Sequence, residues 1–295
     1  MTATVSPTDS PAGTPADARK AARIAAGRAG PAWLLPLGVV VLAWLFPILW
    51  TALTSLKPEG GLTGLTPSFV FTPTLDNYIE LFTERDYGRY LLNSLLIAGG
   101  ATLVSMVLAC FAAYALSRSD IAGREQIGMW ILSLRMLPPI STVVPFYLIL
   151  SGGGLLDSYV GLVGVYLSFS LPFAIWMLQG FFAEVPRSID EAAQADGAGH
   201  LTILFRFIVP MTKSGLAVTT IFTFVFAWNE FLYAFLLTKD RWVTLPVRLG
   251  STITPFQTDW GFLTAGAIVS FLPLVLVVFL LQREMARGVS LGAMR

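Results

Sequence analysis

Few residues in this sequence could carry out chemistry. Its only histidine is His200 and its only cysteine is Cys110, so neither a paired-histidine metal site nor a disulfide within the chain can form. Residues 288–292 read G-V-S-L-G and match the pattern around a nucleophilic serine, but such a serine needs a histidine partner and a strand-to-helix turn. A phosphate-binding loop of the form G-x-x-x-x-G-K-[ST] is absent from the sequence. We therefore expect no enzyme activity, no metal site and no cofactor of the chain's own.

Two charged residues, Arg135 and Glu230, lie inside otherwise apolar segments, and Asn229 stands beside the second. A charge near the centre of a membrane span costs about 2.5–3.5 kcal/mol on insertion scales, so these side chains must face something polar. Pro138 and Pro139 should break the first of the two segments and leave carbonyls free. A membrane protein tolerates such backbone only beside protein or a water-filled cavity, which favours a wet path.

We predict that Arg135, Asn229 and Glu230 border this path for a solute. Trp228 is a further candidate because its ring could stack on a solute, although an aromatic residue here is more often helix packing. A direct ion pair between Arg135 and Glu230 is disfavoured, since their positions differ by about 10 Å along two parallel segments at 1.5 Å per residue. The alternative is structural: Arg135 caps the freed carbonyls and Glu230 bonds a neighbouring subunit.

A polar stretch, DEAAQADGAGHLTILFRFIVP, runs from Asp190 to Pro210 between two apolar segments. Ser188 and Glu191 fit the capping box that begins a helix. Gly197 can adopt the left-handed conformation that ends a helix. The stretch therefore predicts a short helix, a glycine corner and a second helix that runs into Pro210, and together these form a docking surface. A helix that lies in the headgroup region of a membrane is the alternative.

The elements that position these residues are predicted membrane spans. The chain is 55% hydrophobic and 13% charged, with a mean hydropathy of +0.70, whereas about a quarter of the residues in a soluble domain are charged. Six segments are long enough to cross roughly 30 Å of hydrocarbon. They are residues 33–53, 90–116, 127–150, 160–183, 215–238 and 260–282. The predicted fold is an all-α polytopic membrane protein, with six transmembrane helices and a cytoplasmic helix-turn-helix loop.

An even number of spans places both termini on one side of the membrane. With the termini inside, twelve Lys and Arg residues lie inside and six outside, which favours cytoplasmic termini under the positive-inside rule. We expect a disordered cytoplasmic tail at 1–32, a membrane domain at 33–282 with an outer loop at 57–89 and a cytoplasmic loop at 184–214, and a cytoplasmic tail at 283–295. The net charge of +1 without a basic patch argues against nucleic acid as a partner.

The polar stretch resembles the E-A-A-x3-G-x9-I-x-L-P signature of membrane subunits of ATP-binding-cassette importers. The matching residues are Glu191, Ala192, Ala193, Gly197 and Pro210, with Phe207 and Val209 in place of Ile and Leu. The sequence is also similar to the carbohydrate-uptake branch, the second permease of maltose-type and polyol-type systems. This similarity is carried by "NSLLIAGGATLVSMVLACFAAYALSR", "RMLPP", "FAWNEFLYAFLLT" and "GVSLGAMR", and it extends over most of the chain.

The resemblance implies a permease subunit that passes a sugar or polyol from an external binding protein to the cytoplasm across a bacterial inner membrane. Its implied partners are a related permease, two cytoplasmic ATPase subunits, the extracytoplasmic solute-binding protein and membrane lipid. ATP and Mg would be used by the ATPase alone. The residues implied to dock on it and couple ATP use to transport are Glu191, Ala192, Ala193, Asp196, Gly197 and Pro210. The alternative is a polytopic membrane sensor or regulatory subunit with no transport of its own.

Overall fold

The computed structural model describes residues 34–58, 62, 70–253 and 258–292. In this part of the chain every element is helical, and strand-like pairing is confined to an isolated bridge between Ile253 and Thr258. The all-α class predicted from the sequence is therefore confirmed. The predicted tail at 1–32 and part of the predicted outer loop at 57–89 lie outside the described residues.

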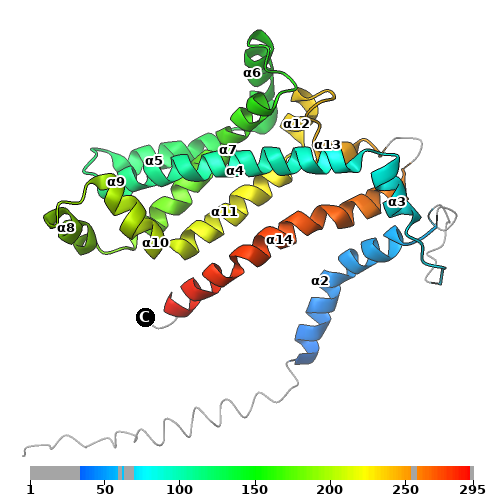
Figure 1. The fold of residues 1–295 in the computed structure, drawn as a ribbon, viewed down its shortest axis with the longest axis horizontal. Helices are drawn as coiled ribbons and strands as arrows, with labels where there is room; N and C mark the ends of the chain where they lie inside the picture. The colour runs from blue at the N-terminus through cyan, green and yellow to red at the C-terminus, as the bar shows by residue number, and fades with distance from the viewer. Residues whose placement is uncertain (1–33, 59–61, 63–69, 254–257, 293–295) are drawn as a thin grey trace, which may run out of the picture. The chain divides into compact units, whose positions relative to one another are not determined.

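The helices are long where the chain is apolar and short where it turns (Figure 1). Their bounds are α2 (Leu34–Ser55), α3 (Asp76–Thr83), α4 (Tyr87–Arg118), α5 (Arg124–Ser133), η3 (Leu134–Met136), α6 (Pro139–Gly152), α7 (Tyr159–Ala183), α8 (Arg187–Ala195), α9 (His200–Ile203), η4 (Leu204–Ile208), α10 (Val209–Met211), α11 (Lys213–Trp228), α12 (Leu232–Leu237), α13 (Leu245–Gly250) and α14 (Trp260–Gly292). Among the described residues, α2, α4, α7 and α14 are each long and apolar enough to cross a membrane. The number of spans rises from four to six if each of two bent helix pairs counts as one.

Helix α2 begins the described chain and lies mostly in a unit of its own that ends at Thr51. It has 22 residues without a charged side chain and contains Pro47. The hydroxyl of Thr51 donates to the carbonyl of Pro47 at 2.8 Å, inside the helix. At 1.5 Å per residue the helix is long enough to cross the hydrocarbon layer. The span predicted at 33–53 is therefore a helix of spanning length.

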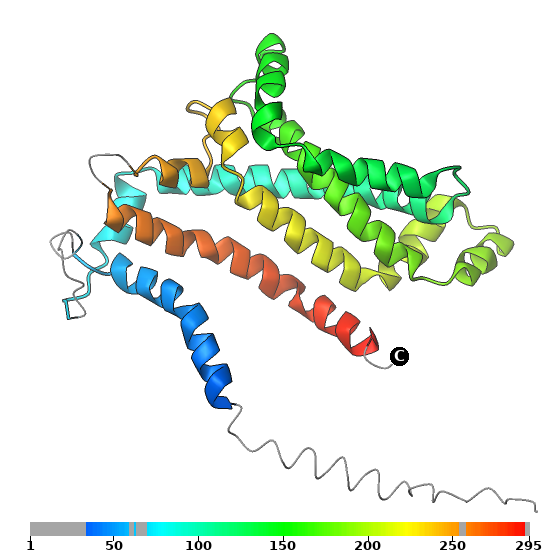
Figure 2. The same cartoon turned by 180° about the vertical axis from the view of Figure 1, so that it is seen from behind.

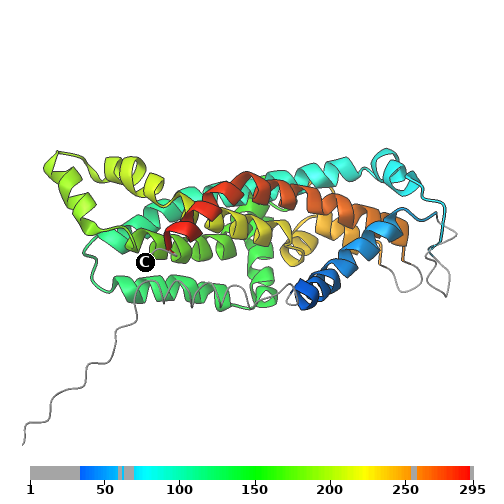
Figure 3. The same ribbon diagram turned by 90° about the horizontal axis from the view of Figure 1, so that it is seen from below.

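The second unit, residues 52–295, is built on α4, α7, α11 and α14. Helix α4 packs along α7 and α11, and α11 packs against α14. Figures 1 and 2 show these helices side by side from opposite faces, and in Figure 3 α14 crosses in front of α11. Small residues permit the close approach of α4: Ala98, Ala101, Ala109 and Ala113 are each at most 1% exposed. Small side chains at helix contacts let membrane helices pack by van der Waals attraction.

The span predicted at 127–150 is broken, as Pro138 and Pro139 led us to expect. It consists of α5, the 3₁₀ turn Leu134–Met136 and α6, and the two arms are bent by 90°. Pro138 has an extended conformation and Pro139 is the first residue of α6. Proline cannot donate a backbone hydrogen bond and disfavours a helical residue before it, so the break occurs at this pair.

The span predicted over residues 215–238 is not one continuous helix. Helix α11 ends at Trp228, and a separate helix, α12, begins at Leu232. The reason is local: the carboxylate of Glu230 accepts a hydrogen bond from the backbone N–H of Tyr233 at 3.0 Å and so begins a new helix. Helix α11 is joined instead to the helical residues His200–Met211 across an 83° bend. The last predicted span, 260–282, lies in α14, which continues to Gly292.

Two hydrophobic clusters hold the second unit together. The first surrounds Leu162, Tyr166 and Trp228 and joins α4, α7, α11, α12 and α14. The second surrounds Leu178 and Phe182 and joins α4 and α7 to the helical residues 200–208. The break between α5 and α6 and the break between α11 and α12 lie beside the first cluster, and the polar stretch that begins at Asp190 lies beside the second. These clusters therefore position the two parts of the predicted functional site.

Candidate functional site

A pocket of about 400 Å³ lies between the break that joins α5 to α6, the break that joins α11 to α12, and α7. Its lining residues are Leu134, Arg135, Leu137, Pro139, Thr142, Phe146, Ser168, Phe169, Phe226, Glu230 and Tyr233. We call it the break pocket. Both Arg135 and Glu230, two of the residues predicted to border a solute path, line it, together with aromatic rings and hydroxyl groups. Its volume falls in the range of small-molecule sites, roughly 300–1,000 Å³. A larger surface groove of about 600 Å³ runs between α5 and α7, but it includes none of the predicted site residues.

Arg135 is held in the break pocket by two aromatic rings. Its guanidinium carbon lies 4.5 Å from the ring centre of Phe173 and 4.2 Å from that of Phe226. Such cation–π contacts stabilise a cation by about 0.5–2 kcal/mol, with the larger values in desolvated sites. Within the described residues, the guanidinium has neither an ion-pair partner nor a hydrogen bond, and Glu230 is not paired with it. Its hydrogen-bond donors therefore remain available on the pocket side.

Glu230 is fixed by its role at the start of α12. Its Oε1 accepts the Tyr233 N–H at 3.0 Å, and its backbone carbonyl accepts the hydroxyl of Tyr166 at 3.4 Å. The hydroxyls of Tyr233 and Thr142 are hydrogen-bonded at 2.6 Å, which ties α12 to α6 across the pocket. The ring of Tyr233 is parallel to that of Phe169, with 6.1 Å between their centres. The pocket wall is therefore a rigid array of two aromatic rings beside a carboxylate.

Asn229 and Trp228 lie elsewhere. Both line a second, smaller pocket of about 230 Å³ between α11, α13 and α14. The Asn229 side chain is exposed and donates to the carbonyl of Val225 at 2.8 Å. Trp228 is 3% exposed and stacks on Phe224. The structure thus brings together only two of the four residues that we predicted to border one path.

The predicted corner in the polar stretch is formed at Gly197. Helix α8 ends at Ala195, and Gly197 has φ +82°. The Gly197 N–H donates to the Gln194 carbonyl and the Ala198 N–H to the Ala193 carbonyl, both at 2.9 Å. This pair of bonds is the Schellman motif, in which glycine adopts the left-handed conformation at no steric cost. The helix, glycine corner and second helix of the sequence analysis are therefore present, although the second helix has a π-helical segment, Leu204–Ile208, before Pro210.

The predicted capping box is wrong. Helix α8 begins at Arg187 with Pro186 as its N-cap, and no side chain caps it. Because Pro186 fixes its own φ and Ser188 already lies in the first turn, Ser188 cannot act as the cap residue. Of the residues implied to dock on an ATPase, Glu191, Ala192, Asp196, Gly197 and Pro210 are exposed, whereas Ala193 is 5% exposed and packs into the second cluster.

A buried ion pair behind this exposed surface was missed in the sequence. Arg118, in the last turn of α4, lies 3.3 Å from Asp190 in α8, and both side chains are at most 10% exposed. Arg118 also donates to the carbonyls of Phe182 and Val185, both at 2.7 Å. The available signal was a basic residue in the last turn of a helix, where it can satisfy free carbonyls. Nothing local in the sequence, however, connects Arg118 with Asp190.

A second missed residue is Asp157, in the turn between α6 and α7. Its carboxylate accepts the N–H groups of Asp240 at 3.0 Å and of Arg241 and Trp242 at 2.9 Å each. Partial burial would raise the pKa of Asp157, but these backbone hydrogen bonds outweigh it and hold the pKa below its ordinary value. The Asp157 N–H donates to the carbonyl of Leu237 at 3.0 Å. Asp157 therefore fixes the segment that follows α12.

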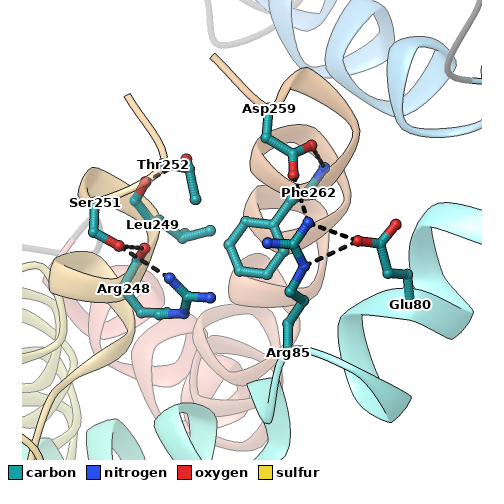
Figure 4. A network of polar contacts seen from close by, with 8 residues as sticks. All are labelled: Glu80, Arg85, Arg248, Leu249, Ser251, Thr252, Asp259 and Phe262. Carbon is teal, nitrogen blue, oxygen red and sulfur yellow. Dashed lines mark hydrogen bonds and ion pairs between the residues drawn. The ribbon is translucent and has the colours of Figure 1, made fainter. Parts of the chain in front are cut away.

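At the same end of the unit, two arginines hold an aromatic ring between them. Figure 4 shows Phe262 between Arg85 and Arg248, whose guanidinium carbons lie 5.7 and 5.1 Å from its ring centre. Arg85 also pairs with Glu80 at 2.8 Å and with Asp259 at 3.2 Å. The hydrogen bond to Glu80 is the main reason that the pKa of Arg85 is raised. This network fixes α3 and the start of α4 to the start of α14.

Comparisons with known proteins agree with this arrangement. Residues 105–291 match the family described as "Binding-protein-dependent transport system inner membrane component". The trehalose/maltose transport system permease protein MalG of Thermococcus litoralis is 33% identical over 89% of this chain and 96% of that protein. The trehalose transport system permease protein SugB of Mycobacterium tuberculosis is 35% identical over 89% of this chain and 97% of that protein. A chain of a bacterial ABC transporter that imports the acidic polysaccharide alginate has the same fold, with a TM-score of 0.71 at 23% identity, and the match covers 93% of this chain and 99% of that chain.

The fold and its pocket define a multi-pass helical membrane protein with a polar site between broken helices. The family match covers well over half of the chain, and the relatives are matched over nearly their whole length. The chain belongs to the binding-protein-dependent transport system inner membrane component family. It is a membrane permease of a binding-protein-dependent importer, and its relatives are permease subunits rather than catalytic ones. The sensor alternative is not favoured.

Proposed function

We propose that this permease carries a sugar or polyol and that the solute passes the break pocket. The observation that carries the proposal is the wall formed by Arg135, Glu230, Phe169 and Tyr233 around about 400 Å³. Sugars combine hydroxyl groups with apolar ring faces, and a pocket with a few polar groups and aromatic rings suits both. The names of similar proteins support the solute class, because they include permeases for trehalose, maltose and maltodextrin.

We propose further that the exposed surface of Glu191, Ala192, Asp196 and Gly197 docks on a separate cytoplasmic ATPase. A carboxylate on a short helix can accept a charge-assisted hydrogen bond from an arginine of a partner. Because Gly197 has no side chain, a partner can approach the backbone closely. The assembly would contain two ATPase subunits, which use the ATP and Mg, a related permease and an external binding protein. A similar alginate transporter, with a TM-score of 0.60 at 15% identity, is described in complex with a pentasaccharide-bound periplasmic protein.

The orientation in the membrane is part of the proposal. We expect both tails, 1–32 and 283–295, and the loop at 184–214 in the cytoplasm, and the loop at 57–89 outside. In a Cys110→Ser background, an impermeant thiol reagent should label Leu62→Cys and Asp240→Cys in intact cells. Asp196→Cys should remain unlabelled until the cells are opened. Labelling of Asp196→Cys from outside would refute the orientation.

The solute path is tested by uptake of a panel of labelled sugars and polyols in cells with and without the chain. Glu230→Gln keeps an oxygen that can accept the Tyr233 N–H, so α12 should form while the negative charge is lost. Ser168→Ala removes one hydroxyl from the same wall. Both variants should alter the preference among solutes in a complex that still contains the ATPase.

Asn229→Ala is the matched comparison, because Asn229 lines the smaller pocket and not the break pocket. It should leave the preference among solutes unchanged. If all three variants transport every solute as the wild type does, the break pocket is not the path. If Asn229→Ala alone changes the preference, the smaller pocket takes its place. The solute class is supported if cells take up a sugar or polyol of the panel only when the chain is present. It is refuted if uptake of every sugar and polyol is the same with and without the chain.

A further inference from the structure

Arg118 connects three helices with one guanidinium group. It lies in the last turn of α4, it donates to the carbonyls of Phe182 in the last turn of α7 and of Val185 just after α7, and it pairs with Asp190 of α8. We call these contacts the Arg118 clamp. The last carbonyls of a helix have no partner within it, and a basic side chain is a suitable donor for them. The clamp therefore satisfies the end of α7 and holds α8 against α4 at the same time.

Because the clamp is buried, the charge of Arg118 and the charge of Asp190 each compensate the desolvation of the other. The side chains of Arg118 and Asp190 are 7% and 10% exposed. Neither carboxylate oxygen of Asp190 has a hydrogen bond within the described residues, so the Arg118 charge alone offsets its burial. A buried ion pair adds little net stability, but removal of one partner is strongly destabilising because it leaves the other charge without compensation. A tilt of α8 that broke the pair while either charge stayed buried would have the same consequence, so the clamp resists such a tilt.

The surroundings also favour a single body. Phe182 is fully buried and Ala193 is 5% exposed, and both belong to the second cluster with α4 residues such as Ala113. The ring of His200, which begins α9, contacts that of Tyr114 in α4 at 6.5 Å between centres. Helix α8 therefore shares its buried cluster with α4 and α7.

We propose that the Arg118 clamp makes α8 move with α4 and α7 as one body, so that a displacement of the exposed loop reaches the membrane helices without loss. This inference rests on the proposed coupling role of Glu191 and Gly197. Arg118 and Asp190 are positioning residues, because they contact neither solute nor ATPase in this arrangement. Without the clamp, α8 could tilt while α4 and α7 stay in place, and ATP would be hydrolysed without transport.

The proposal is tested by distance measurements in the assembled complex. Spin labels are attached at Leu108→Cys in α4 and Gln194→Cys in α8, both exposed positions outside the clamp, in a Cys110→Ser background. Pulsed electron paramagnetic resonance then gives the distance distribution without nucleotide and after trapping with ADP and vanadate. We expect the same distribution in both states for the wild type. In Asp190→Asn the distribution should differ between the states. A change between the states in the wild type would overturn the proposal.

Transport measurements complete the test. In Asp190→Asn we expect ATP hydrolysis to continue and uptake per ATP to fall at least about tenfold, because an unpaired buried charge shifts a local equilibrium by that factor or more. Asp120→Asn is the control, since it makes the same change at an exposed acidic residue just after α4. Equal uptake per ATP in Asp190→Asn and wild type would contradict the clamp.

Two further variants keep the outcomes distinct. Arg118→Lys keeps the charge beside Asp190 but cannot make the forked contacts, so we expect uptake per ATP between that of wild type and Asp190→Asn. If it equals the wild type, the forked contacts have no role and the proposal fails. Ala192→Cys, at an exposed position of the same surface, should form a cross-link to the ATPase. Absence of that cross-link with an unchanged distance between Leu108→Cys and Gln194→Cys would refute the coupling role while leaving the clamp intact.

Discussion

Removal of the Asp157 carboxylate should loosen the segment that follows α12. In the structure this carboxylate accepts three backbone N–H groups at 2.9–3.0 Å, from Asp240, Arg241 and Trp242. Asp157 itself has φ +51°, in the left-handed region that favours glycine, asparagine and aspartate. Asp157→Asn tolerates this conformation and keeps one acceptor oxygen, whereas Asp157→Ala loses all the acceptors and adds backbone strain.

The size of the effect follows from the hydrogen bonds. A hydrogen bond to a charged group contributes about 1.5–3 kcal/mol when buried. Two of the three bonds here are exposed to solvent, and competition from water weakens them. We therefore expect the three bonds together to contribute about 2 kcal/mol, which is lost in Asp157→Ala. About 2 kcal/mol corresponds to roughly a 30-fold change in the equilibrium between closed and open segment. Asp157→Asn should show about half this free-energy change, which is roughly fivefold.

Hydrogen exchange of the purified complex measures this equilibrium directly. The amides of Asp240, Arg241 and Trp242 should exchange roughly 30-fold faster in Asp157→Ala than in wild type, and roughly fivefold faster in Asp157→Asn. Exchange in α7 should be unchanged, which shows that the fold is intact. Asp120→Ala serves as the control for loss of an exposed acidic residue. Unchanged exchange at residues 240–242 in Asp157→Ala would refute the assignment of Asp157 as the acceptor that closes this segment.

The remaining predictions concern the corner, the cap and pH. Gly197→Ala should lower uptake, because the left-handed conformation costs alanine about 1–2 kcal/mol. The protein should still insert, because no atom lies within 4 Å of an added Cβ. Gly197→Pro should abolish uptake, and normal transport by this variant would contradict the role of the corner. Glu191→Lys should release the ATPase on affinity purification, and full retention with normal uptake would contradict docking. Glu230→Ala should raise hydrogen exchange in α12 by about fivefold for a lost cap of about 1 kcal/mol, whereas Glu230→Gln should not. Because the pKa of Asp157 is lowered in the folded protein, the stabilisation that its carboxylate gives the segment should be complete above about pH 4 and lost as pH falls through the lowered pKa. Proteolysis of the segment at several pH values measures this loss. Loss already at pH 5 would show that the sign is wrong.

Local patterns in the sequence predicted those parts of the fold that depend on local chemistry. The apolar segments at 33–53, 90–116, 160–183 and 260–282 each form a helix of spanning length. Pro138 and Pro139 predicted the break between α5 and α6, and Gly197 predicted the corner after α8. In each case one residue type restricts its own backbone, by a fixed φ in proline or by the absence of a side chain in glycine. Such restrictions act wherever the residue is placed.

The rest depends on contacts that the linear order does not contain. Hydropathy extended the fifth span to Thr238, because Glu230 was counted as a charge inside a helix rather than as an acceptor just before a new helix. The pair of Arg118 and Asp190 and the contacts of Asp157 join segments far apart in the chain, and a sequence without aligned relatives gives no sign of the pairing. Ser188 fitted the capping box in spacing, but Pro186 had already fixed where α8 begins.

Three charged residues in the described part of this chain serve the ends of helices or the backbone just beyond them. Glu230 accepts the N–H of Tyr233 at the start of α12, Asp157 accepts three N–H groups after α12, and Arg118 donates to two carbonyls at and just after the end of α7. In a membrane protein each broken helix leaves backbone groups that lipid cannot satisfy, and a polar side chain must replace the missing hydrogen bonds. The breaks that create the pocket and the loop therefore require these residues. Arg135 is different, since among the described residues it meets only aromatic faces, so it is the charged group in the pocket that is free to respond to a solute.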